Sequence, residues 1–135
     1  MSVELINPEG IVNLPVHHQA SVATGSKIIS LAGQVSWDAD AQLVGKGDLA
    51  AQAEQAYLNV AKALSGLGAG MDDLTQVTVY VVGYTPAAGK QVMEGRRRAA
   101  DRLGMNFQHP GTFVGVTSLF DPDYLIEVQA TAIID

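Results

Sequence analysis

The chain has 135 residues, of which 47% are hydrophobic and 16% charged, with a formal net charge of −6. This length predicts a single domain, residues 1–135, which buries about two-thirds of its unfolded surface without disulfides or metals. The lack of cysteine excludes thiolate zinc sites and cysteine nucleophiles. The negative charge disfavours general binding to nucleic acid or to anionic membranes.

The first residues carry no basic region followed by an apolar run, and no segment approaches about eighteen continuous apolar residues. These features predict a soluble, cytoplasmic protein. Sparse charge beside a large hydrophobic fraction predicts self-association, because a small monomer of this composition would expose large apolar patches. We therefore expect a homo-oligomer.

The first part of the chain predicts short strands. Residues 2–6 are expected to form a strand that ends in the turn sequence of residues 7–10. Residues 21–24 and 27–32 are β-prone and flank a Gly-Ser pair. This pattern predicts a hairpin with a two-residue loop.

Two helices are predicted on either side of a central strand. Asp48 is a plausible N-cap for the first helix, and glycines from Gly66 onward end it. Residues 74–84, rich in valine, threonine and tyrosine, predict the strand. Thr85 and Pro86 start the second helix, which Gly104 closes. The apolar stripe of the first helix is expected to contain Leu49, Ala53, Ala56, Tyr57, Val60, Leu64 and Leu67.

The last fifth of the chain contains two apolar-rich runs, residues 112–120 and 124–134, around an Asp-Pro-Asp turn. This arrangement predicts a hairpin in the middle of a sheet. Alternate residues of the second run form a wholly apolar face, which is expected to carry the helices. The opposite face places Glu127 beside Gln129, where both need water or a partner. One wall of a functional site is expected there.

Each predicted helix has only one apolar face, so both are expected on the same side of a single mixed sheet of about six strands. The result is a two-layer α/β sandwich. The opposite face of the sheet is left bare, and we expect another subunit to cover it.

Three segments, in this order and spacing, resemble the RidA/YjgF family of reactive-intermediate deaminases. They are residues 27–34 (KIISLAGQ), 72–84 (DDLTQVTVYVVGY) and 109–132, and the resemblance spans nearly the whole chain. It implies a chorismate-mutase-like fold and a homotrimer with inward-facing sheets and three clefts between subunits. We predict no cofactor and no metal ion.

Family members that hydrolyse enamines and imines such as 2-aminoacrylate bind the substrate carboxylate with an arginine two residues after the equivalent of Pro110. Here Thr112 stands at this position and offers one neutral hydroxyl in place of a charged, bidentate group. The sequence therefore resembles an arginine-lacking subgroup. The match also places the family's substrate-binding glycine on Gly33, its cleft tyrosine on His18 and an asparagine of the second helix on Gly95.

The family's cleft glutamate, which is thought to position the attacking water, falls on Gln129 in this match. Glutamine can orient water but cannot accept its proton. Glu127 lies on the same face, about 7 Å further along the strand, and is the alternative. We predict Gln129 and Glu127 as catalytic residues, and Gly33, Thr112 and His18 as substrate-binding residues.

Two clusters of charged or titratable residues have alternative interpretations. His17, His18 and His109 could form a metal cluster, but adjacent histidines on an extended segment point to opposite faces, so at most one of that pair can line a cleft. Residues 96–98, all arginine, could supply a cation to the site. Pairs at four-residue spacing, Glu94 with Arg98 and Arg97 with Asp101, favour a solvated helix face instead.

The leading functional hypothesis is a hydrolase or deaminase that acts on a small enamine, imine or related reactive metabolite in the inter-subunit clefts. The alternative is a non-catalytic trimer that binds a small metabolite or a partner protein in the same clefts. Ribonuclease activity has also been attached to the family, but the acidic balance of this chain and its lack of a basic stripe with interleaved aromatic residues disfavour it.

Overall fold

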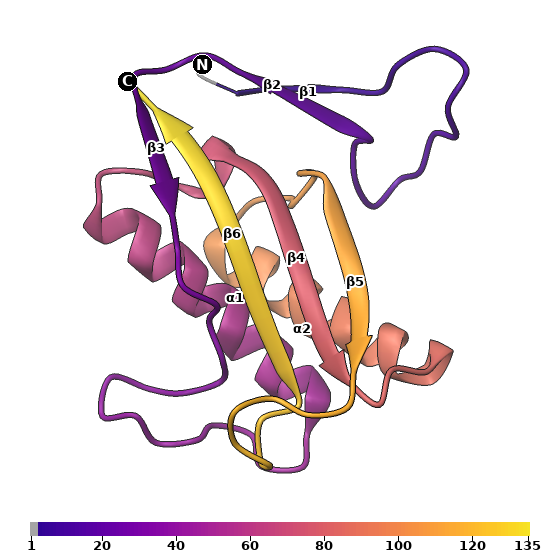
Figure 1. The fold of residues 1–135 in the computed structure, drawn as a ribbon, viewed down its shortest axis with the longest axis vertical. Helices are drawn as coiled ribbons and strands as arrows, with labels where there is room; N and C mark the ends of the chain where they lie inside the picture. The colour runs from indigo at the N-terminus through magenta and orange to yellow at the C-terminus, as the bar shows by residue number, and fades with distance from the viewer. Residues whose placement is uncertain (1–2) are drawn as a thin grey trace.

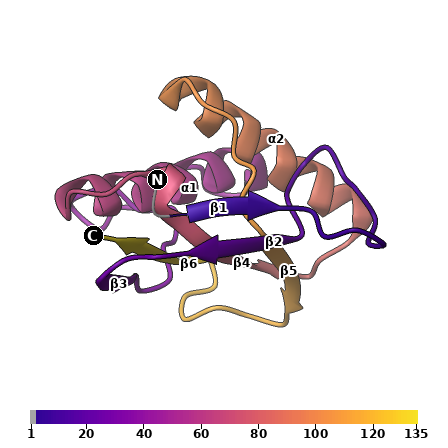
Figure 2. The same ribbon diagram turned by 90° about the horizontal axis from the view of Figure 1, so that it is seen from above.

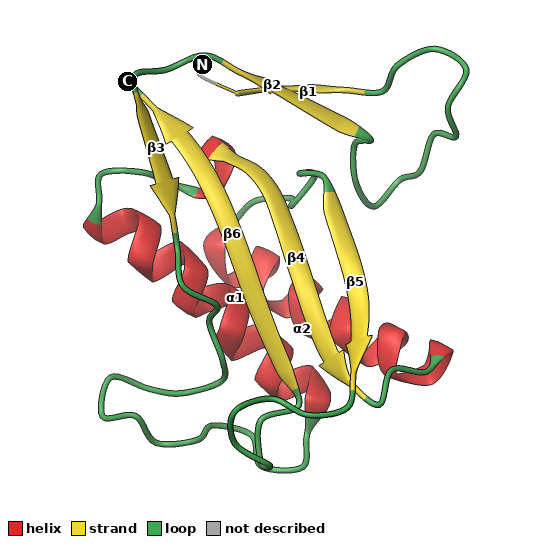
Figure 3. Ribbon diagram, in the orientation of Figure 1, coloured by secondary structure: helices red, strands yellow, loops and turns green. Residues whose placement is uncertain are grey.

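The computed structural model describes residues 3–135. A four-stranded mixed sheet carries both helices on one face, and a second, two-stranded sheet lies across one end (Figures 1 and 3). The predicted two-layer α/β fold is confirmed. The strands are β1 (Val3–Ile6), β2 (Ala20–Ala23), β3 (Lys27–Ser30), β4 (Leu74–Val82), β5 (Gly111–Val116) and β6 (Ile126–Ile134); the helices are α1 (Leu49–Gly66), α2 (Pro86–Leu103) and a short 3-10 helix, η1 (Met71–Asp73).

The larger sheet has the order β3-β6-β4-β5, with β6 antiparallel to both neighbours and β5 parallel to β4. The predicted C-terminal hairpin is therefore wrong, because β4 lies between β5 and β6. The turn itself forms, with the Asp123 N–H donating to Asp121 Oδ1 at 2.9 Å. Helix α2 returns the chain to the end of the sheet where β4 began, so β5 pairs parallel with β4 and takes the edge position.

The predicted N-terminal hairpin is also wrong, and the six strands are divided between two sheets. β2 pairs with β1, whereas β3 pairs with β6. A Cβ atom at Gly25 would lie 2.6 Å from the carbonyl oxygen of Ile134. The glycine is therefore needed where the chain passes close to the end of β6. The first predicted strand is confirmed over β1, and Ser2 lies outside the described residues.

The helix ends follow the predicted signals. Asp48 Oδ1 accepts the Ala51 N–H at 3.0 Å, and Thr85 Oγ1 accepts the Ala88 N–H at 3.1 Å. Gly104 ends α2 with a φ of 66°, in the left-handed region. Leu67 does not share the buried stripe, because α1 ends at Gly66 and the Leu67 side chain is 55% exposed.

The core lies between the helices and the larger sheet. Figure 2 shows the helices as one layer and the sheet as the other. Gly95 allows the helices to approach, since a Cβ atom there would lie 2.3 Å from the Ala50 carbonyl oxygen. Neither helix within residues 3–135 is long and apolar enough to cross a membrane. The buried face of β6 carries the helices as predicted. Side chains from β6, β4, α1 and α2 pack together in this core: Ile126, Val128, Ala130, Ala132, Val77, Val79, Val81, Tyr57, Val60, Leu64, Val92 and Ala99.

Candidate functional site

The face of the larger sheet opposite the helices carries three of the five predicted site residues. Alternation along the strands places Thr78 and Tyr80 of β4 on this face, since Val77 and Val79 are buried under the helices. The strands on either side of β4 place Thr112 of β5, and Glu127 and Gln129 of β6, on the same face. We call this surface the open face; its polar members are Thr78, Tyr80, Thr112, Glu127 and Gln129.

Gln129 is held by a neighbouring tyrosine. Thr78 lies between Thr112 and Gln129 in one cross-strand row, and Tyr80 is opposite Glu127 in the next. The Tyr80 hydroxyl donates to Gln129 Oε1 at 3.2 Å. This bond fixes the amide and uses one acceptor position of its oxygen.

Glu127 lies against Gly33. The chain leaves β3, and Gln34 then exchanges two backbone hydrogen bonds with Val128, of 2.8 and 2.9 Å. This bridge holds Gly33 over the neighbouring side chain: a Cβ atom at Gly33 would lie 2.7 Å from the carboxyl carbon of Glu127. No acceptor for the Gly33 N–H is found among residues 3–135. A free N–H donor and a carboxylate are thus placed side by side.

Thr112 lies at a different part of the open face. It is on the edge strand β5, two strands away from Glu127 and two residues along, a separation of about 12 Å from strand geometry. The open face of one chain therefore does not bring Thr112 together with Gly33.

His18 is on the loop that precedes β2. Its backbone N–H donates to the Gln108 carbonyl oxygen at 2.8 Å, and its Nδ1 lies 3.1 Å from the same oxygen. These contacts attach the loop to the segment before β5. The structure does not bring His18 into contact with Gly33, Glu127 or Gln129.

His17 and His109 line one chamber on the helix side of the sheet, whereas His18 contacts the Gln108 carbonyl oxygen. The described part of the chain contains no group of three His, Asp or Glu side chains that could hold a metal ion. His109 is 5% exposed, and its burial, followed by the nearby Arg96 charge, lowers its pKa to about 4. The ring is therefore neutral at pH 7.

No arginine reaches the open face, because all four lie on α2. Arg97 pairs with Glu94 at 2.7 Å and with Asp101, and Arg98 pairs with Glu94 at 3.2 Å. These pairs confirm the predicted solvated face for Arg97 and Arg98. Arg96 differs, since its Nη2 donates to the backbone oxygens of Val16 and Phe107.

Two comparisons identify the family. The family described as Endoribonuclease L-PSP matches residues 14–134. A crystal structure from Yersinia pestis, YyfB, described as a protein of unknown function of the conserved Rid protein family, is 32% identical with a TM-score of 0.87. The match covers 99% of this chain and 100% of that chain. This chain belongs to the Rid family.

Two structures of lower sequence identity share the fold. Rv2704 from Mycobacterium tuberculosis, a member of the YjgF/YER057c/UK114 family, is 23% identical, with a TM-score of 0.60 over 98% of this chain and 100% of that one. Escherichia coli TdcF with bound serine is 20% identical, with a TM-score of 0.68 over 96% and 94%. The comparison with curated proteins found no match.

Sequence reasoning missed two features of this Rid-family chain. Tyr80 was detectable, because the period of two in β4 places it on the open face with Thr78. The contact between Gly33 and Glu127 had no local signal, since it depends on the bridge between Gln34 and β6. Gly95 lies between the helices and does not reach the open face, so it does not supply the contact that the resemblance assigns to an asparagine.

Proposed function

We propose that the protein hydrolyses a small enamine or imine in clefts between the subunits of a homotrimer. Membership of the Rid family supports the reaction class. The observation that carries the proposal is the Glu127 carboxylate beside the free Gly33 N–H, which combines a proton acceptor with an oxygen-binding donor.

In this proposal Glu127 is the general base. Water adds its oxygen to the imine carbon while one proton passes to the Glu127 carboxylate. That proton then passes to the nitrogen and gives a carbinolamine. Glu127 next takes the hydroxyl proton and delivers it to the same nitrogen, the C–N bond breaks, and ammonia leaves a carbonyl product. The Gly33 N–H binds a substrate oxygen. Gln129 is better suited to orienting the water, because its amide cannot accept a proton.

Thr112 and His18 are proposed to contact substrate from the neighbouring subunit. The separation of Thr112 from Glu127 within one chain, about 12 Å, supports a shared cleft, since a small substrate cannot span it. Ile28, which is 73% exposed on β3, supports burial of the sheet against another copy.

The proposed substrate carries no carboxylate at Thr112. A threonine in place of a bidentate arginine costs about 2 to 5 kcal/mol in binding a carboxylate, and none of the four arginines replaces it on the open face. We therefore expect poor turnover of 2-aminoacrylate.

The test is hydrolysis of 2-aminoacrylate, generated in place by a serine dehydratase, at equal concentrations of protein. We expect Thr112→Arg to exceed the wild type, because it restores the carboxylate contact on an otherwise competent site. Thr112→Met is the matched control, of similar length without charge, and should give no gain. If Thr112→Arg is inactive with its oligomeric state intact, the proposed chemistry is rejected.

The alternative is a non-catalytic trimer that binds a small metabolite or a partner protein in the same clefts. The absence of arginine from the open face of the described chain, together with the bond between Tyr80 and Gln129, favours it. It predicts saturable binding of a metabolite without turnover in a calorimetric screen. Ribonuclease activity remains disfavoured by the net charge of −6.

A further inference from the structure

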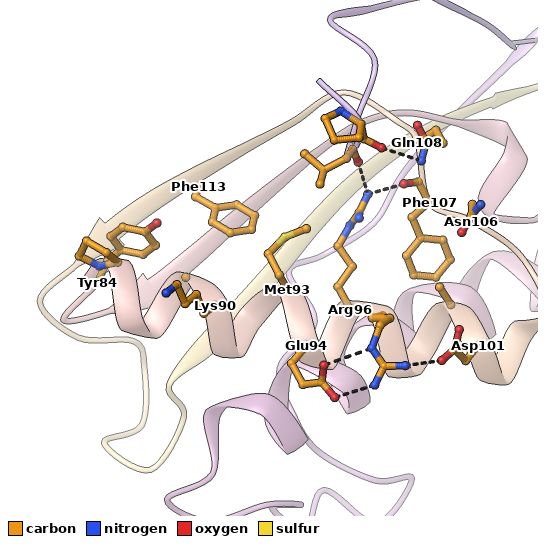
Figure 4. Close-up of a pocket in the computed structure, with 16 residues that line it drawn as sticks. Tyr84, Lys90, Met93, Glu94, Arg96, Asp101, Asn106, Phe107, Gln108 and Phe113 are labelled. Atoms are coloured by element: carbon orange, nitrogen blue, oxygen red, sulfur yellow. Dashed lines mark hydrogen bonds and ion pairs between the residues drawn. The ribbon is translucent and has the colours of Figure 1, made fainter. Parts of the chain in front are cut away.

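A chamber of about 260 Å³ lies on the helix side of the larger sheet, opposite the open face. Its lining comes from β4, β5, both helices and the loop before β2, and includes Val77, Val79, Met93 and Phe113. The chamber adjoins a groove of about 700 Å³ along α2, drawn in Figure 4, because Met93 and Phe113 line both.

Arg96 is the only lysine or arginine in the lining of this chamber. It differs from the other arginines of α2, because no ion pair joins it to a carboxylate within residues 3–135. Figure 4 shows its side chain extending from α2 toward Phe107, away from Glu94 and Asp101. Its guanidinium carbon is 5.7 Å from the centre of the Phe107 ring.

Within residues 3–135 the Arg96 guanidinium donates to neutral groups only. Its Nη2 donates at 3.1 Å to the Val16 carbonyl oxygen and also to that of Phe107. Burial raises the pKa of the Tyr57 hydroxyl, and the charge of the Arg96 guanidinium and a hydrogen bond from it oppose that rise. Two backbone carbonyls bind a guanidinium without neutralising it. Charge-assisted bonds to an anion are about twice as strong as neutral ones, so the remaining donors favour an anionic acceptor.

His109 adds an unpartnered polar group to the same lining. Its Nδ1 lies 3.4 Å from the Pro110 carbonyl oxygen, which can only accept, so the ring proton belongs on Nδ1. Nε2 is then an acceptor, buried and without a partner in the described part of the chain. A buried acceptor of this kind costs stability unless a donor satisfies it, and because a carboxylate can only accept, the donor here is a water or another group of a bound ligand.

We propose that this chamber binds a small carboxylic acid with an apolar body, whose carboxylate is held by Arg96. The body would lie against Val77, Val79 and Phe113. An apolar cavity of about 150 Å³ already accommodates benzene, so the chamber has room for an aromatic ring with its carboxylate. A single cation fits a monocarboxylate better than a phosphate dianion. The site is separate from the open face and does not depend on its chemistry.

Benzoate is a suitable probe, with benzamide as the neutral ligand of the same shape. We expect benzoate at millimolar concentrations to shift the methyl NMR signals of Val77, Val79 and Met93 saturably. Benzamide should bind about tenfold more weakly or worse, because the charge-assisted contact is lost.

Two variants separate ligand binding from a purely structural role of Arg96. Arg96→Gln should weaken benzoate binding by about tenfold or more while leaving benzamide binding unchanged. Arg97→Gln, whose arginine pairs outside the chamber, should bind benzoate like the wild type. If Arg96→Gln does not remain folded, Met93→Trp should block the chamber and abolish binding with Arg96 in place.

Three results would overturn the proposal. They are an absence of saturable shifts with benzoate, equal affinity for benzoate and benzamide, or shifts confined to signals of the open face such as Thr112. Unchanged benzoate affinity in a folded Arg96→Gln protein would also contradict it, because Arg96 would then only hold the loop at Val16 and would not bind the ligand.

Discussion

The carboxyl group of Glu127 occupies the space that a side chain at Gly33 would need, with 2.7 Å between its carbon and an added Cβ atom. Gly33→Ala should therefore displace Glu127, because the bridge from Gln34 to Val128 holds the backbone in place. A displacement of about 1 Å can reduce turnover by about 10²-fold.

To test this effect, turnover or metabolite affinity is measured for the wild type and Gly33→Ala, together with thermal unfolding of both proteins. Gly66→Ala is the control, since an added Cβ atom there would meet nothing within 4 Å. We expect Gly66→Ala to retain full function. Equal function in both variants would show that the position of Glu127 is unimportant.

Glu127→Gln and Gln129→Ala distinguish the two predicted catalytic residues. If Glu127 is the base, Glu127→Gln should lower kcat by about 10²- to 10⁴-fold, because the glutamine amide cannot accept a proton. Gln129→Ala should have a smaller effect, since Gln129 is bonded to Tyr80. A larger loss in Gln129→Ala would reverse the assignment.

Gln52 should be a major determinant of stability. Its side chain is fully buried, donates to the Gly45 and Asp123 carbonyl oxygens, and accepts the Leu125 N–H at 2.9 Å. Gln52→Met leaves these backbone groups unpaired and should cost about 3 kcal/mol in unfolding free energy.

Gln55→Met is the matched control for chemical denaturation, because Gln55 bonds only the Asn59 side chain. It should change the free energy of unfolding by about 0.5 kcal/mol or less. Similar losses in the two variants would mean that the loop contacts of Gln52 contribute little.

His109 should make stability depend on pH. Burial lowers its pKa from 6.5 to about 4 in the folded protein. Below pH 6.5 the unfolded chain binds a proton that the folded protein excludes, so stability falls as pH decreases from 6.5 toward 4. The shift corresponds to about 3 kcal/mol. Urea unfolding should show a shallower decline over this range in His109→Gln than in the wild type.

The elements with local signals could be predicted from the sequence. Asp48, Thr85 and Gly104 mark the helix ends because their hydrogen bonds or backbone angles are local. The two hairpins could not be predicted correctly, since a turn sequence specifies a change of direction and not a pairing partner. β6 inserts between strands that are distant in the sequence, and no local pattern encodes that choice.

The candidate site divides in the same way. Alternation along β6 places Glu127 and Gln129 on one face, as predicted from the sequence. Only the bridge between Gln34 and Val128 determines that Glu127 meets Gly33. Likewise, helical spacing predicts the ion-pair partners of Arg97 and Arg98. The backbone contact of Arg96 could not be predicted in this way, because it is made with Val16, about eighty residues earlier in the sequence.

The central position of β6 has a consequence for biosynthesis. This strand bonds to β3 on one side and to β4 on the other, yet it is translated after every other element of this fold. Until residues 126–134 leave the ribosome, β3 has no partner in the larger sheet and the apolar sides of both helices lack part of their cover. A stalled nascent chain that still holds these residues in the exit tunnel should therefore be sensitive to proteases and attractive to chaperones.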